Sequence, residues 1–101
     1  MKYLVTGLPG GVSVPSEHGA ELLQAGLAWI KSKQAEGTID IHYSFYGGGG
    51  MAIINGDSHE QILEQILSYP LYPFFDWEVS PLIDFESAYQ SYASFYKRLS
   101  G

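Results

Sequence analysis

Segment 69–82 constrains the fold of this chain more than any other stretch. Pro70 and Pro73 end any preceding helix, because proline lacks the backbone N–H that a helix needs. Apolar and acidic residues then alternate: Phe75, Trp77 and Val79 with Asp76 and Glu78. Side chains of a strand point alternately to its two faces. The segment therefore predicts a strand over residues 74–82, with one apolar and one acidic face.

Three further strands are predicted from short apolar or alternating runs. These runs lie at residues 2–6, 39–46 and 51–55. The last two flank the glycines at positions 47–50, which favour a hairpin turn. A phosphate-binding loop is the other interpretation of such a run, but it would lead into a helix carrying Gly-Lys-Ser/Thr, and this one leads into a strand.

Three helices are predicted from apolar residues at helical spacing and from capping residues. Ser16 is expected to cap the first, which ends before Gly37, and Ser58 with Gln61 forms a capping box for the second. Asp84 is expected to cap a third, within residues 83–101. That helix has an apolar stripe made of Phe85, Ala88, Tyr92, Phe95 and Leu99.

The order of these elements predicts a single α+β domain over residues 1–101. The β-α-β-β-α-β order is that of a ferredoxin-like fold, with a four-stranded antiparallel sheet in the order 4-1-3-2 and two helices on one face. In the second strand, one alternating set is expected to face the helices: Ile39, Ile41, Tyr43 and Phe45. The other set is expected to face away: Asp40, His42, Ser44 and Tyr46.

Composition favours self-association. Aromatic residues make up 15% of a chain of only 101 residues, more than so small a core needs. We expect the free faces of two sheets to meet in a dimeric α/β barrel, as a homodimer or within a larger ring. We expect the third helix to pack on a neighbouring subunit.

Charge and cysteine content exclude several partners. The net charge of −6 disfavours nucleic acid and anionic membranes, which both require basic surfaces. There is no cysteine, and no apolar run approaches the length of a signal peptide or membrane span. The expectation is a cytoplasmic protein.

Two groups of side chains are candidates for chemistry. His42 shares its predicted strand face with Tyr46, and histidine exchanges protons near neutral pH. Asp76 and Glu78 share the acidic face of the last strand, where burial would raise the pKa of at least one carboxyl. The alternatives are a histidine bonded at a subunit contact and a solvated edge strand. Strands two and four are opposite edges, so His42 and Glu78 are not expected to touch within one subunit.

Metal binding is not expected. His18 and His59 each lie in the first turn of a predicted helix, and neither has a second ligand three or four residues away. We therefore expect no metal and no organic cofactor.

The motif PLYPFFDWEVSPL, within segment 69–82, resembles the end of the muconolactone isomerase family. That resemblance implies a ferredoxin-like dimeric barrel and an isomerase that shifts a proton on a lactone without a cofactor. It also places Asp76 and Glu78 at motif positions. The family tends to carry basic residues on its second strand and the following hairpin, whereas residues 38–50 contain no Lys or Arg. A small neutral or aromatic ligand therefore suits this chain better than an anion.

Two classes of function follow. The first is an isomerase-like enzyme, with Glu78 or His42 as base and Tyr46 as hydrogen-bond donor; a cofactorless monooxygenase-type barrel is a variant of it. The second is a non-catalytic module for ligand binding or oligomerisation. Fold alone does not choose between them.

Overall fold

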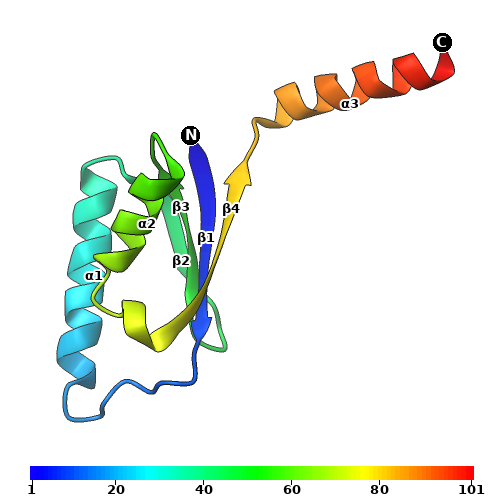
Figure 1. Ribbon diagram of the computed structural model, residues 1–101. Coiled ribbons are helices and arrows are strands. Elements are labelled where there is room, and N and C mark those ends of the chain that lie inside the picture. Colours follow the sequence, from blue (N-terminus) through cyan, green and yellow to red (C-terminus); the bar gives the residue numbers. More distant parts are fainter.

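The computed structural model describes residues 1–101 as one antiparallel sheet, two helices that cover it, and a third helix outside (Figure 1). The elements are β1 (Lys2–Pro9), α1 (Gly19–Ala35), β2 (Ile39–Ser44), β3 (Gly50–Asn55), α2 (His59–Leu67), the 3₁₀ turn η1 (Tyr72–Phe74), β4 (Phe75–Leu82) and α3 (Phe85–Ser100). The sheet order is β2-β3-β1-β4, which confirms the predicted 4-1-3-2 order. None of the helices is long and apolar enough to cross a membrane.

The helix caps follow the sequence at α2 and α3 but not at α1. The Ser58 Oγ accepts a hydrogen bond from the Gln61 N–H at 3.1 Å, and the Asp84 carboxylate accepts one from the Ser87 N–H at 3.0 Å. The prediction that Ser16 caps the first helix was wrong. That helix begins after His18, which makes no side-chain cap, because residues 16–18 form a separate turn.

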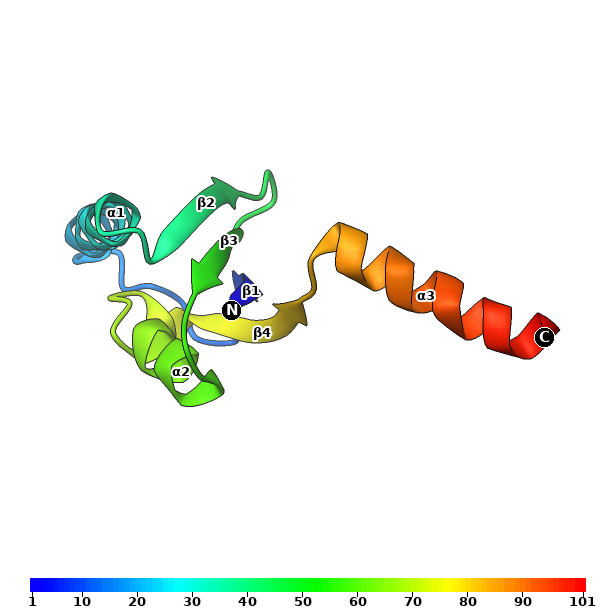
Figure 2. The same cartoon turned by 90° about the horizontal axis from the view of Figure 1, so that it is seen from above.

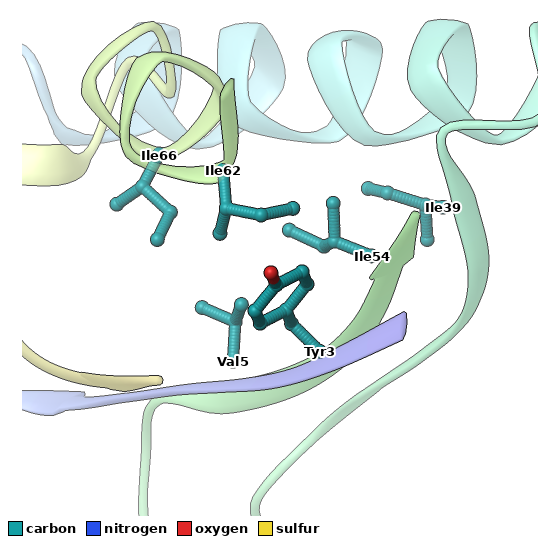
Figure 3. Close-up of a cluster of buried hydrophobic side chains, with 6 residues drawn as sticks. All are labelled: Tyr3, Val5, Ile39, Ile54, Ile62 and Ile66. Carbon is teal, nitrogen blue, oxygen red and sulfur yellow. The ribbon is translucent and has the colours of Figure 1, made fainter. Parts of the chain in front are cut away.

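The core lies between the sheet and the two covering helices (Figure 3). It is made of Tyr3, Val5, Ile39, Ile54, Ile62 and Ile66. Tyr3 is only 2% exposed, and its hydroxyl lies 2.7 Å from the Nδ1 atom of His59 at the start of α2. This contact gives the buried hydroxyl the partner that it needs.

A β-bulge in β2 changes which residues face the helices. Ile39 pairs with Ile54, but Ile41 pairs with Ile53, so Asp40 is an extra residue between them. The side chain of Asp40 is held by Lys2 and Asn55.

The bulge places His42 on the helix-facing side. His42 pairs with Ala52, which pairs in turn with the buried Val5. The prediction that Ile41 and Tyr43 face the helices was wrong: they point to the opposite side, where they are 38% and 65% exposed. That prediction assumed uninterrupted alternation, and one extra residue reverses every side chain that follows it.

Helix α3 extends away from the rest of the chain, as Figures 1 and 2 show. It contributes no buried residue, and the longest dimension of the molecule is 65 Å. The aromatic side chains of its apolar stripe are exposed: Phe85 by 71%, Tyr92 by 59% and Phe95 by 48%. The sequence expectation that α3 has no place on its own core is confirmed. Its packing on a neighbouring subunit stays a prediction.

Candidate functional site

A cavity of about 300 Å³ lies between the helix-facing side of the sheet and the helices. Its sheet side is formed by residues of β1, β2 and β3, including Val5, His42 and Ala52. Helix α1 and the chain after α2 supply part of the opposite wall, including Leu23, Trp29, Ile30, Tyr69 and Leu71. Of its 21 lining residues 15 are hydrophobic, so the cavity suits a small, mostly apolar ligand.

The Trp77 side chain lies against Gly7 of β1 and lines the cavity. Trp77 pairs with Gly7, and a Cβ atom at Gly7 would lie only 2.9 Å from the indole ring. Any side chain larger than that of glycine would therefore displace the ring. The indole N–H donates to the carbonyl oxygen of Tyr72 at 3.0 Å, and the Tyr72 ring stacks on it at 6.1 Å. The apolar face predicted for β4 is therefore used to wall a cavity.

His42 is the ionisable base of the cavity wall. It is half-buried, and its ring makes no hydrogen bond within the chain, which leaves both nitrogens available to a ligand. Ser44 shares this side with His42, as expected, but both were predicted to face away from the helices; Ser44 also lines the cavity. No Lys, Arg, Asp or Glu lines it, so the site has no permanently charged side chain to pair with an anion or a cation.

Tyr69 is a polar cavity residue that sequence reasoning missed. Burial raises the pKa of its hydroxyl above the ordinary value of 10.0. The only sequence signal at this position was that Tyr69 precedes Pro70 and follows a helix. Its place in the cavity depends on contacts with α1, which are distant in the sequence.

The other predicted site residues lie elsewhere. Asp76 pairs with Leu8 and Glu78 with Thr6, so both carboxylates are exposed on the sheet side that faces away from the helices, here called the open face. Tyr46 is fully exposed in the turn after β2. His42 and Glu78 therefore lie on opposite sides of the sheet and do not touch within one chain, as expected. The catalytic roles of Asp76, Glu78, Tyr46 and His42 stay predictions.

The structure shows no group of three His, Asp or Glu side chains that could hold a metal ion. His18 and His59, the two histidines outside the cavity, lie at the starts of α1 and α2. His18 approaches only Glu21, at 4.0 Å, and His59 approaches Tyr3.

The fold and the cavity define a class: a ferredoxin-like α+β protein with a ligand-sized space between its sheet and helices. Muconolactone isomerase has the same fold, with a TM-score of 0.73 and 21% identity over 83% of this chain and 90% of that one. So has the 5-chloro-2-hydroxyhydroquinone dehydrochlorinase of Burkholderia phenoliruptrix, with a TM-score of 0.70 and 15% identity over 86% and 98% of the two chains. The latter was solved in complex with 2,5-dihydroxybenzoquinone.

No protein-family model and no curated protein sequence matches this chain. The two solved structures nevertheless confirm, at the level of the fold, the resemblance that the motif in segment 69–82 indicates. At these identities, they establish the fold and leave the reaction to be argued from the site.

Proposed function

We propose that this chain is a muconolactone isomerase-like protein that shifts a proton on a small, uncharged cyclic carbonyl compound without a cofactor. One observation carries the proposal: the mostly apolar cavity has one ionisable base, His42, on its wall. A buried apolar space with few polar groups is the usual form of a small-molecule site.

The chemistry assigned to His42 is general base and then general acid catalysis. A neutral imidazole takes a proton from the carbon next to the ring carbonyl, and the electron pair left behind is delocalised onto the carbonyl oxygen. The imidazolium then returns that proton to the far end of the conjugated system. The substrate and the product are isomers, so no oxidant, reductant or leaving group is needed.

The lining residues and the solved neighbours support this class of substrate. A carboxylate in the cavity would lack a cationic partner, and burying an unpaired charge is costly. One neighbour is an isomerase of a lactone, and the other was solved with a quinone-type ring bound. Both are named for small oxygenated compounds, and we propose an uncharged member of that class for this chain.

The test is turnover of α-angelica lactone, an uncharged lactone whose conjugated β-isomer forms by a single proton shift. We expect the wild-type protein to accelerate this shift and His42→Gln to lower kcat by about 100-fold or more, the usual contribution of a general base. The reaction is followed by ¹H NMR, in which the ring protons of the two lactone isomers give separate signals. His18→Gln is the matched control, because His18 is exposed and outside the cavity, and it should behave as wild type.

Two results would contradict the proposal. One is a wild-type rate no higher than that of buffer. The other is full activity in the His42→Gln variant, which would move the base elsewhere. In that case a parallel Glu78→Gln variant tests whether the Glu78 carboxylate on the open face is the base. Glu78, Asp76 and Tyr46 lie outside the cavity, so any role for them in catalysis requires a site formed with a second subunit.

The second candidate function is a non-catalytic ligand-binding or oligomerisation module. It is favoured by α3, whose exposed aromatic stripe belongs to no site within the chain. Self-association, as a homodimer or larger ring, is proposed under either function. Binding of a neutral ring without turnover would favour the module over the isomerase.

A further inference from the structure

The hydroxyl group of Tyr69 has no hydrogen-bond partner within the chain, although the indole N–H groups of the two tryptophans beside it do. The Trp29 indole N–H donates to the Ser68 Oγ atom at 3.1 Å, and the Trp77 indole N–H donates to the Tyr72 carbonyl oxygen at 3.0 Å. Tyr69 packs between these two tryptophans and lines the cavity. This hydroxyl is therefore available as a hydrogen-bond donor to a molecule that enters the cavity.

Packing holds the Tyr69 ring in a defined position. Its ring centroid lies 5.2 Å from that of Trp29 and 5.8 Å from that of Trp77, both in edge-to-face geometry. Its hydroxyl rests against Gly26 of α1, where an added Cβ atom would come within 3.3 Å of the oxygen. A glycine in the middle of a helix costs stability, and here it leaves room for the Leu71 side chain, which the added Cβ would approach to 3.0 Å, and for the hydroxyl. The group is therefore pre-positioned in the manner of a binding residue.

Burial also fixes the protonation state of this group. Because desolvation raises the pKa of Tyr69 above 10.0, the hydroxyl keeps its proton throughout the neutral range. A protonated phenol is a hydrogen-bond donor, and a ring carbonyl oxygen is a matching acceptor.

We propose that the Tyr69 hydroxyl donates a hydrogen bond to the carbonyl oxygen of the ligand that occupies the cavity. The inference rests on the proposed function and narrows it, because it selects cyclic carbonyl compounds over hydrocarbons of equal size. It also gives the residue a role in the reaction: negative charge develops on that oxygen when His42 removes the neighbouring proton, and a fixed donor stabilises it.

The experiment compares two probes that differ at the carbonyl. Coumarin is a neutral unsaturated lactone, and 2H-chromene has the same rings with CH₂ in place of the carbonyl. The chain contains only two tryptophans, both of which line the cavity, so their indole N–H signals in ¹H–¹⁵N spectra report occupancy. Titrations give the dissociation constant of each probe for wild type, Tyr69→Phe and Tyr72→Phe. Tyr72 is the matched control, since it also contacts Trp77 but does not line the cavity.

We expect Tyr69→Phe to weaken coumarin binding by about tenfold, the loss that one hydrogen bond of this kind produces, and chromene binding by less than twofold. Tyr72→Phe should leave both unchanged. Equal effects of Tyr69→Phe on the two probes, or none, would overturn the assignment of Tyr69 alone. Failure of the wild-type protein to bind either probe would overturn the ligand cavity and the assignment together. If coumarin binding depends on Tyr69 but the lactone assay shows no turnover, only the isomerase proposal fails.

Discussion

Asp40 is the residue on which the arrangement of β2 depends. Its carboxylate is hydrogen-bonded by the Lys2 ammonium group, and it accepts a second hydrogen bond from the Asn55 side-chain amide at 2.7 Å. Both hydrogen bonds hold the pKa of Asp40 below its ordinary value of 3.8, and the bond from Lys2 has the larger effect. The bulge therefore carries a charged cluster that ties the first and third strands to it.

We predict that Asp40→Asn lowers the free energy of unfolding at pH 7 and that the loss disappears in acid. A carboxyl whose pKa is lowered by folding stabilises the folded state above its unfolded pKa of 3.8. That stabilisation is lost as the pH falls through the still lower folded value. In urea unfolding, the variant and the wild type should therefore differ in stability at pH 7 and become equal as the pH is lowered below 4. Glu64→Gln, which removes an exposed carboxylate without a side-chain partner, should show no such convergence.

The turn between β2 and β3 requires glycine at particular positions. Gly48 and Gly49 have φ angles of 106° and 78°, in the region that L side chains rarely adopt. A Cβ atom at Gly49 would also collide with the carbonyl oxygen of Gly7 on β1. Glycine at positions 48 and 49 is therefore needed for this turn, and at position 49 also for the close approach of the hairpin to the first strand.

We predict that Gly49→Ala destabilises the fold by about 2 kcal/mol or more, because backbone strain and a steric clash add. Gly47→Ala is the matched control in the same turn. Gly47 has no positive φ, and its added Cβ would meet nothing within 4 Å. Thermal and urea unfolding of the two variants should separate them clearly, and equal stability would contradict the structural role given to Gly49.

The elements and their order were predictable from the sequence, since they depend on local periodicity, caps and turn residues. Ser58 and Asp84 show this for α2 and α3. The bulge was not predictable, because residues 39–46 alternate without a break and the partners of Asp40 are 38 and 15 positions away. His42 was recognised as a candidate base but assigned to the wrong side of the sheet for the same reason. Tyr69 was missed because its signal is the contact with Gly26, on another helix.

A single chain leaves two large surfaces of the molecule without a partner. Helix α3 extends from the body, and the open face of the sheet is covered by no element of the chain (Figures 1 and 2). Of the eleven acidic residues only Glu86 lies within α3, whereas Lys97 and Arg98 lie in its last turn. A second copy offers α3 both an apolar surface and charges of opposite sign.

We predict that the chain self-associates through the apolar stripe of α3. A Tyr92→Ser and Phe95→Ser double variant should shift the assembly toward monomer at micromolar concentrations, as measured by sedimentation velocity. The control is Gln90→Ser with Ser94→Gln, which changes the opposite, polar face of the same helix and should leave the mass unchanged. A monomeric wild-type chain, or equal shifts in both variants, would contradict this role of α3.

The bulge at Asp40 also affects how this protein should be compared with others. In a relative whose second strand lacks the extra residue, an alignment without a gap at Asp40 matches side chains of the same orientation on one side of this position only. If the gap is placed wrongly, a side chain from the outer surface is matched with His42. The role of a residue on this strand should therefore be inferred by superposition of structures, with the bulge as the reference point, and not by column in an alignment.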